Sequence, residues 1–359
     1  MFLIDESLNI SYDSLVSDLN EGVSAHLLCS FVKDIVDNRD INLTSYEQDD
    51  NALKNTLTSK EELTERVLSS KSTISLNTSG TTGKKKTIKH KVSDLILDTK
   101  KVNEKSVWLY TYNPFHMGGI QVFLQSLINN NTIVYAYKKD REYILQSIKD
   151  FRVTHISSTP TFYKLLSPFE EPYESVVRTT VGGERVDSFT LNLIKKMFPN
   201  SKTTNIYALT EAGSILYSNS DIFNLNERCK IVDDVLHVKD KSGEWCDTGD
   251  SVKLVSQNKF YFFGRRKNII NIAGSDVNPT EVEDLLKQSE KLQDAIVYSK
   301  SASLLGNVLV CDVIKRDQTI TEKEVKKILK DKGLESHEIP RIINFIDKLK
   351  ISDNVKVSI

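Results

Sequence analysis

The spacing of apolar residues along the chain predicts helices first and then an alternation of strands and helices. In the first 70 residues, the stretches SLVSDLNEGV and LLCSFVKDIV place apolar residues at helical spacing. From Ser72 to Ile215, β-rich runs such as STISLN, SVWLYTY and TTNIYA alternate with helical runs such as GIQVFLQSLI and REYILQSIKDF. This alternation predicts an α/β fold in which helices cover a mostly parallel sheet.

Beyond Ile215 the pattern changes to hairpins and then to a small mixed unit. The stretches RCKIVDDVLHVKD and SVKLVSQNKFYFFGRR predict hairpins, the second of which turns at Gln257–Asn258. Past Arg266, EVEDLLKQ and EKEVKKILKDKG predict helices, whereas DAIVYS, VLVCDVI and RIINFID predict strands. The length of 359 residues suits about two domains of roughly 150 residues each, and we expect the last part to form a small α+β domain.

Composition and charge narrow the class of protein. The chain carries 48 basic and 49 acidic side chains, a balance that argues against a dedicated binder of nucleic acid or membrane surfaces. Its four cysteines show no CxxC pair, so the sequence gives no support for a zinc site. The start MFLIDESLN has acids where a signal peptide needs basic residues, and no apolar run approaches the roughly 18 residues of a membrane helix. We therefore expect a cytoplasmic protein.

Three polar motifs follow predicted strands. They are TSGTTG at residues 78–83, GGE at 182–184 and ALTE at 208–211. In parallel sheets, ligands bind beyond the carboxyl ends of the strands. We therefore expect all three motifs to meet at one edge of the sheet.

The first motif has the chemistry of a phosphate-binding loop. Ser79, Thr81 and Thr82 offer hydroxyl groups, and the glycines allow backbone N–H groups to turn inward. The lysines at 84–86 can neutralise phosphate charge. Only two residues separate Gly80 from Gly83, whereas the common phosphate loop needs four, so an ordinary nucleoside triphosphatase of that type ranks last. A polar surface loop is an equally good interpretation of this motif alone.

Two further motifs carry nucleotide-binding chemistry. Tyr207 offers a ring that could stack on a base, and Glu211 offers a carboxylate for a metal ion bound to phosphates. Asp250 and Arg265 offer a carboxylate and a guanidinium that could hold the hydroxyls of a ribose. Taken singly, these residues also fit a strand end and solvated turn charges.

The ordered set of motifs is far more specific than its members. The order TSGTTGxxK, PFH, GGE, YxxTE, TGD, GRxK and AGxxVxPxEVE, from about Ile74 to the end, resembles the adenylate-forming superfamily. This superfamily includes acyl-CoA synthetases, peptide-synthetase adenylation domains and luciferase. The stretches VTHISSTPTFYKLL and PFHMGG are most similar to the short ligases of the 2-succinylbenzoate–CoA ligase group.

The resemblance implies an acid–thiol ligase that uses ATP and Mg²⁺. A small carboxylic acid would attack the α-phosphate of ATP, which yields an acyl-adenylate and pyrophosphate. The thiol of CoA, or of the phosphopantetheine arm of an acyl carrier protein, would then take the acyl group. A runner-up interpretation is a degenerate adenylate-binding subunit that lacks full turnover or depends on a partner.

The resemblance also implies a role for each matching residue. The residues around the β- and γ-phosphates would be Thr78, Ser79, Gly80, Thr81, Thr82, Gly83 and Lys86. Those around the adenine and the acyl pocket would be Gly182, Gly183, Glu184 and Tyr207. Thr210 and Glu211 would bind the α-phosphate and magnesium, while Asp250 and Arg265 would hold the ribose. Lys267 would be the hinge, and Gly274 would line the thiol channel.

The resemblance implies catalytic roles for Lys356 and His116, but each residue also has a plain structural interpretation. Lys356 falls where the family has a catalytic lysine, but Val355 precedes it in place of glycine, and it could be a solvated tail lysine. His116 could close the pocket and gate the carboxylate, or it could be a satisfied core histidine. Amino-acid-activating relatives tend to have an aspartate at this position, so a histidine makes an amino-acid substrate less expected.

The motifs lie closer together than the family leads one to expect. The phosphate loop begins at Thr78, and Glu211 and Asp250 are only 39 residues apart. We therefore expect a large domain at 1–264 with a shortened first subdomain and a trimmed, barrel-like β part. A hinge at 265–267 and a small mobile α+β domain at 268–359 would follow. Trimming could uncover apolar surface and favour a homodimer or another partner.

Overall fold

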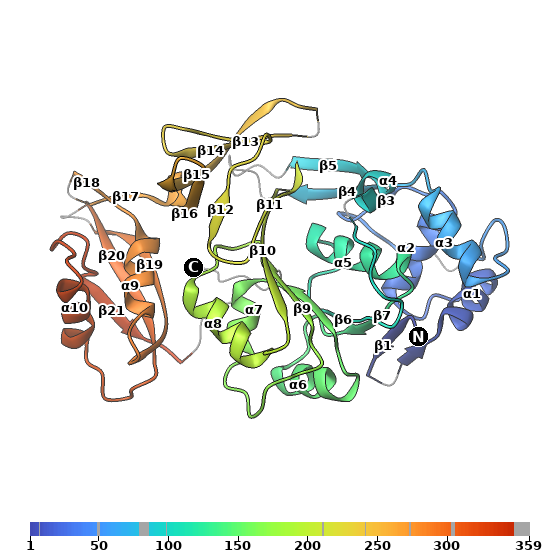
Figure 1. Cartoon of the computed structure of the whole chain (residues 1–359), viewed down its shortest axis with the longest axis horizontal. Helices are drawn as coiled ribbons and strands as arrows, with labels where there is room; N and C mark the ends of the chain where they lie inside the picture. The colour runs from blue at the N-terminus through green and yellow to red at the C-terminus, as the bar shows by residue number, and fades with distance from the viewer. Residues whose placement is uncertain are drawn as a thin grey trace. The chain divides into compact units, whose positions relative to one another are not determined.

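The chain folds into two compact units. The computed structural model describes residues 1–6, 8–48, 51–78, 86–97, 99–209, 212–240, 242–272, 274–302 and 306–347. Among these residues, the first unit contains 1–183 and 193–215, and the second contains 184–192 and 216–347 (Figure 1). Unit 1 holds the large sheet except for the end of one edge strand (216–218), and unit 2 holds most of the hairpins and the small C-terminal sheet.

An eight-stranded sheet organises unit 1. Its strands, in spatial order, are β11 (Gly213–Ser218), β10 (Lys202–Leu209), β9 (Arg178–Gly182), β8 (His155–Ser158), β6 (Val107–Tyr110), β7 (Thr132–Tyr135), β1 (Leu3–Asp5) and β2 (Leu8–Ile10). Strands β10, β9, β8, β6, β7 and β1 are parallel, whereas β2 is antiparallel to β1. The prediction of an α/β fold with a mostly parallel sheet is confirmed.

Helices pack on this sheet, on the smaller sheet beside it and on one another. They are α1 (Tyr12–Glu21), α2 (Leu27–Val36), α3 (Lys60–Leu68), α4 (Val92–Leu97), α5 (Met117–Ile128), α6 (Arg141–Asp150), α7 (Pro160–Leu165) and α8 (Ser188–Met197). Figure 1 shows α5 and α2 on one side of β6 and β7, and α6 on the other. The apolar faces of α1 to α5 form one core with Tyr110 of β6 and Ile133 of β7.

Side-chain caps fix where several of these helices begin. The side chains of Ser11 and Asp140 accept hydrogen bonds from the backbone N–H groups of Ser14 and Tyr143, at the starts of α1 and α6. Each cap satisfies a backbone donor that the helix itself leaves unpaired. Short polar residues after strands therefore set the boundaries of the crossover helices.

The predicted sharing of one sheet edge is only partly correct. Strands β9 and β10 are neighbours in the large sheet, so the motifs at 182–184 and 208–211 follow adjacent parallel strands. The strand before TSGTTG is β4 (Thr73–Thr78), which belongs to a separate sheet with β3 (Ile41–Asn42) and β5 (Lys86–Lys91). The expectation that all three motifs follow strands of the same sheet was wrong for β4. Strand β4 pairs in parallel with the short β3, which is distant in sequence, and forms an antiparallel hairpin with the lysine-rich β5.

A five-stranded antiparallel sheet forms the first part of unit 2. Its order is β12 (Ile222–Asn224), β16 (Lys259–Arg265), β15 (Trp245–Ser256), β14 (Val235–Lys239) and β13 (Cys229–Val232). Both predicted hairpins, β13–β14 and β15–β16, are confirmed. The rings of Phe223, Phe260 and Phe262 pack together across β12 and β16, with centroids 5.4 to 6.1 Å apart.

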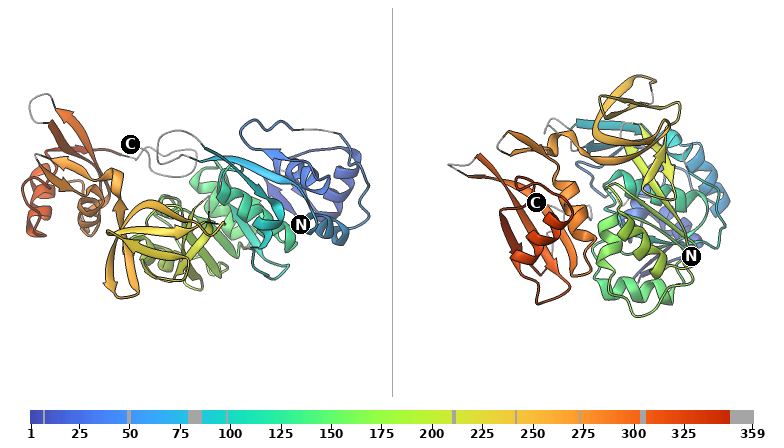
Figure 2. Two further views of the ribbon diagram at one scale, coloured as in Figure 1. Left: turned by 90° about the horizontal axis from the view of Figure 1, so that it is seen from above. Right: turned by 60° about the vertical axis from the view of Figure 1, so that its left-hand side comes forward.

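The last part of unit 2 is an α+β fold (Figure 2). After the short helix η1 (Arg266–Asn268), it contains β17 (Ile270–Ile272), β18 (Ser275–Val277), α9 (Pro279–Lys287), β19 (Leu292–Ala302), β20 (Gly306–Lys315), α10 (Glu322–Asp331) and β21 (Ile342–Phe345). Strands β19, β20 and β21 form one sheet, and apolar residues of α9 and α10 pack into the same core as this sheet. The predicted small α+β fold is confirmed, whereas its mobility and the boundary at 265–267 stay predictions. None of the helices in the described ranges has the length and apolar composition to cross a bilayer.

Candidate functional site

Strand order marks a candidate ligand-binding position in unit 1. From β6 the chain crosses to β7 on one side, but from β8 it crosses to β9 in the opposite direction. The order therefore reverses between β6 and β8. In open α/β sheets, ligands bind beyond the carboxyl ends of the strands at such a switch point.

Buried hydroxyl groups occupy this switch point. Thr111, directly after β6, donates from Oγ1 to the carbonyl of Ser157 at 3.1 Å and lies 2.9 Å from Oγ of Ser158 at the end of β8. Thr159 follows and accepts from the backbone N–H of Phe162 at the start of α7. Sequence reasoning did not bring Thr111 and Ser158 together, because their proximity depends on the order of the strands.

His116 begins α5, the helix that follows β6. Its Nδ1 accepts from the backbone N–H of Gly118 at 3.3 Å, so the proton of the neutral ring lies on Nε2. The residue is half-buried, and its backbone N–H donates to the carbonyl of Asn113 at 3.0 Å. His116 thus has a structural role as a helix cap, and its predicted role as a gate stays a prediction.

The motif after β9 is shaped by glycines. Gly182 pairs with Ile206 of β10, and a Cβ atom at Gly182 would lie 2.7 Å from the carbonyl oxygen of Ile206. Gly183 has a φ of 80°, in the left-handed region that glycine tolerates best. Tyr207, next along β10, is half-buried. The structure thus brings Gly182, Gly183 and Tyr207 to neighbouring strand ends, and Glu184 continues the chain there.

Asp250 and Arg265 form an ion pair across β15 and β16. They are register partners, and the Nε of Arg265 lies 2.6 Å from Oδ1 of Asp250. The Asp250 side chain is 8% exposed and that of Arg265 is 41% exposed. Arg265 also donates to the carbonyl of Thr248 at 3.2 Å. A carboxylate that accepts and a guanidinium that donates, side by side, suit the hydroxyls of a ribose, although this role stays a prediction.

The predicted hinge and thiol-channel residues follow this ion pair along the chain. Lys267 lies in η1, directly after β16. Gly274 stands in the turn between β17 and β18 with a φ of 92°, and its N–H donates to Oδ1 of Asn271 at 3.0 Å. Their roles stay predictions.

Several predicted residues lie outside the described part of the chain. They are Ser79, Gly80, Thr81, Thr82, Gly83, Thr210, Glu211 and Lys356. The ends of the phosphate-loop motif are placed at backbone level, because Thr78 at the end of β4 is the register partner of Lys86 at the start of β5. Among the described residues, no group of three or more His, Cys, Asp or Glu side chains could hold a metal ion.

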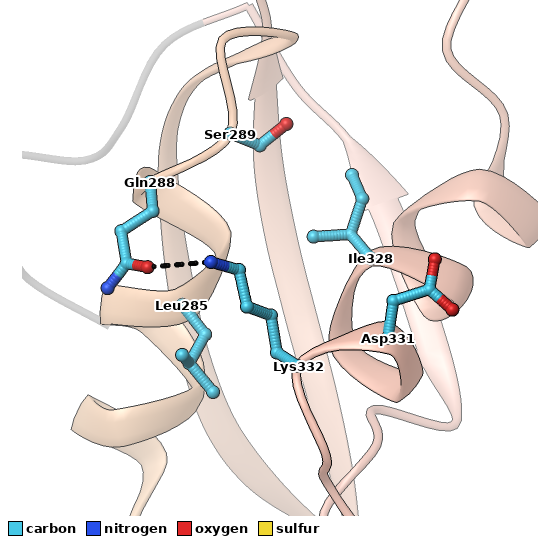
Figure 3. A pocket seen from close by; sticks show the side chains of 6 residues that line it. All are labelled: Leu285, Gln288, Ser289, Ile328, Asp331 and Lys332. Atoms are coloured by element: carbon cyan, nitrogen blue, oxygen red, sulfur yellow. Dashed lines mark hydrogen bonds between the residues drawn. The ribbon is translucent and has the colours of Figure 1, made fainter.

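Two surface hollows are lined by other residues. The first, of about 260 Å³, lies between α9 and α10 (Figure 3), and Lys332 at its rim donates to Oε1 of Gln288 at 3.1 Å. Leu285 and Ile328 provide apolar surface there. The second, of about 510 Å³, lies near the starts of α1 and α3 in unit 1. None of the predicted site residues that the structure describes lines either hollow.

Comparison with known proteins gives the class that this fold and these motifs define. Residues 22–252 match the family model described as AMP-binding enzyme. The 2-succinylbenzoate–CoA ligase of Listeria monocytogenes serotype 4b (strain F2365) is 25% identical over 319 residues, which cover 78% of this chain and 67% of that ligase. The chain therefore belongs to the AMP-binding enzyme family, and the resemblance found in the motifs is confirmed.

Solved structures share the fold. MenE from Bacillus subtilis, in complex with the acyl-adenylate intermediate OSB-AMP, has a TM-score of 0.61 and 22% identity, with 79% of this chain and 67% of that chain covered. ATP-bound MatB from Rhodopseudomonas palustris has a TM-score of 0.63 and 17% identity, with 78% and 65% covered. The chain thus spans about two thirds of the length of these relatives.

Proposed function

We propose that the chain is an ATP-dependent ligase that joins a carboxylic acid to a thiol through an acyl-adenylate. The observation that carries the proposal is the Asp250–Arg265 ion pair, at the positions where the family's ordered motifs predict ribose ligands. The family match and the names of relatives such as 2-succinylbenzoate–CoA ligase support the same reaction class.

In the first half-reaction the acid's carboxylate attacks the α-phosphorus of ATP. The bond from that phosphorus to the bridging oxygen breaks, and pyrophosphate leaves. Two anions must approach each other in this step, so Lys356 would offset their negative charge, an effect commonly worth a few kcal/mol of barrier. Magnesium held by Glu211 would neutralise phosphate charge. Asp250 and Arg265 would hold the ribose, and the Gly182–Gly183 turn would frame the adenine.

In the second half-reaction a thiol attacks the acyl carbonyl, and AMP leaves. We propose CoA as the acceptor, because the curated relatives are named CoA ligases. A carrier protein's phosphopantetheine arm is the other acceptor that this chemistry allows. Gly274 would line the thiol's path, and Lys267 would be the point about which the small domain turns.

We propose that the substrate is a small carboxylic acid. Its identity can be tested by starting with the acid for which the relatives are named. 2-Succinylbenzoate is the first candidate, because several relatives are named for it. His116 favours acids without an amino group, since a neutral or protonated imidazole cannot pair with an ammonium as an aspartate does. A cytoplasmic location and a homodimer stay predictions.

The test is product analysis of the full chain with ATP, Mg²⁺, CoA and a panel of aryl, short-chain and long-chain acids. The expected products are AMP, pyrophosphate and one acyl-CoA detected by mass spectrometry. Asp250→Asn removes a charged partner of the ribose. It should raise the KM for ATP about 10- to 100-fold, because hydrogen bonds to charged groups contribute roughly 1.5–3 kcal/mol.

The matched control is Asp233→Asn. Asp233 is an exposed residue of the β13–β14 turn with a φ of 49°, a conformation that asparagine also tolerates. This variant should keep the wild-type KM. ATP binding without AMP formation for any acid would overturn the ligase proposal and favour a non-catalytic adenylate-binding protein. An unchanged KM in Asp250→Asn would remove Asp250 from the site.

A further inference from the structure

Charged contacts hold the segment Glu184–Asn192 to helix α9 within unit 2. This segment directly follows the Gly182–Gly183 turn. The guanidinium of Arg185 forms an ion pair with the carboxylate of Asp284 on α9. The two side chains are only 27% and 26% exposed. An ion pair shielded to this degree is screened less by salt than a fully exposed one.

A second contact lies two residues further along the segment. The carboxylate of Asp187 accepts a hydrogen bond from the backbone N–H of Thr190 at 2.6 Å. Thr190 lies in the first turn of α8. The negative charge of Asp187 also acts on Lys287, at the end of α9. Phe189 provides a third contact, because the guanidinium carbon of Arg316 lies 5.7 Å from its ring centroid. The side chains at positions 185, 187 and 189 thus each interact with a residue in the C-terminal part of unit 2.

Lys287 is the centre of a shielded charge cluster. Its Nζ lies 3.2 Å from Oδ1 of Asp294 and 3.7 Å from Oε2 of Glu283, and its side chain is 16% exposed. Glu283 accepts from the backbone N–H of Val297 at 2.8 Å. Burial opposes the charge on Lys287, but the surrounding carboxylates, led by Asp294, outweigh it and raise the lysine's pKa. The cluster therefore fixes the end of α9 against β19.

We propose that Arg185 and Asp187 are positioning residues for nucleotide binding, which hold the Gly182–Glu184 turn ready during the adenylation half-reaction by fastening the following segment to α9; the turning of the small domain about Lys267 would release this contact for the second half-reaction. The inference rests on the proposed function of that turn. Gly183 has the left-handed backbone of a flexible position, so an unfastened turn would lose conformational entropy when ATP binds. A fastened turn has met that cost before ATP binds, which strengthens binding through preorganisation.

The kinetic test uses Arg185→Ala and the charge-swapped pair Arg185→Asp with Asp284→Arg. Arg185→Ala should raise the KM for ATP about three- to tenfold and leave kcat within about twofold, because the residue touches no reacting atom. The swap restores an ion pair and should return the KM to within about twofold of wild type. Lys291→Ala is the control, since it removes the Lys291–Glu324 pair elsewhere in unit 2 and should leave the KM unchanged.

A second readout does not depend on turnover. Hydrogen exchange of the full chain should show faster exchange in 184–192 and in α9 for Arg185→Ala than for wild type, with protection restored in the swap. Calorimetric titration with ATP should show the matching loss and recovery of affinity. If no acid supports turnover, the proposed function fails, and these two measurements still decide the inference. Unchanged ATP affinity in Arg185→Ala, or a swap that stays as weak as the single variant, would overturn it.

Discussion

The imidazole of His155 in β8 lies in a shielded position beside a cation. Its ring centroid is 4.7 Å from that of Trp108, and Nδ1 is 2.8 Å from Oγ1 of Thr154. Arg178 is its register partner on β9. Burial first, and then the positive charge of Arg178, lower the pKa of His155 to about 4. The folded chain therefore disfavours the imidazolium, which ties the stability of unit 1 to pH.

The sign of this effect follows from the two pKa values. An unfolded histidine takes up a proton near pH 6.5, whereas folded His155 does so only near pH 4. The unfolded state binds more protons between these values, so the free energy of unfolding falls as pH drops from about 6.5 to 4. His155→Gln should show a shallower fall over this range. Urea unfolding at pH 7 and 4.5, followed by Trp108 fluorescence in a Trp245→Phe background, measures it.

Parallel pH curves for His155→Gln and its parent would contradict this assignment. Trp245→Phe is the parent chain for the comparison, because it leaves Trp108 as the single tryptophan.

Single residues of the site were predictable where local spacing determines their neighbours. Asp250 lies seven residues before Gln257, and Arg265 lies seven residues after Asn258. A hairpin turning at Gln257–Asn258 places them opposite each other, because the two register shifts along this hairpin cancel. The pairing of Thr111 with Ser158 was not predictable. It joins strands that are neighbours only because the chain crosses back over β6.

At the scale of elements, helix α5 shows how close packing can override helix propensity. A Cβ atom at Gly119 would lie 2.3 Å from the carbonyl oxygen of Asn113 and 2.8 Å from the hydroxyl of Tyr110. At Gly118 it would meet only the Tyr112 ring, at 3.3 Å. A rigid backbone atom cannot move aside at the first position, whereas a side chain can shift slightly at the second.

These contacts predict opposite behaviour for two neighbouring substitutions. Alanine in a helix is favoured over glycine by roughly 1 kcal/mol, and overpacking costs about 1–3 kcal/mol. Gly119→Ala should therefore lower the free energy of unfolding by up to about 2 kcal/mol, while Gly118→Ala should be neutral or stabilising. Denaturant titration of both variants checks this. Equal stability of the two variants would refute the packing argument.

The elements themselves were largely predictable, but their assignment to sheets was not. Alternating apolar runs located β6 to β10 and the helices between them. Strand β5 was not predicted, because half of the residues in its sequence KTIKHK are lysines, which leaves no clear apolar alternation. Strands β1 and β2 have three residues each, too few for a periodic signal. The separate sheet of β4 depends on pairing with β3, which is distant in sequence.

At the scale of the whole molecule, the two units divide the candidate site chemistry. Unit 1 carries the switch-point hydroxyls, His116, the Gly182–Gly183 turn and Tyr207. Unit 2 carries the Asp250–Arg265 pair, Lys267 and Gly274. The order of motifs along the chain was enough to predict the family, because the motifs come from both units. Spatial relations within each unit required the fold.

The central claim is that this chain forms an acyl-adenylate. The most direct measurement is incorporation of radiolabelled pyrophosphate into ATP, with each acid of the panel and without any thiol. Reversal of adenylation needs the acid but no acceptor, so at least one acid should support exchange in the absence of CoA. Lys356→Ala should abolish that exchange. A chain that binds ATP yet exchanges pyrophosphate with no acid, or only when CoA is present, would contradict the claim.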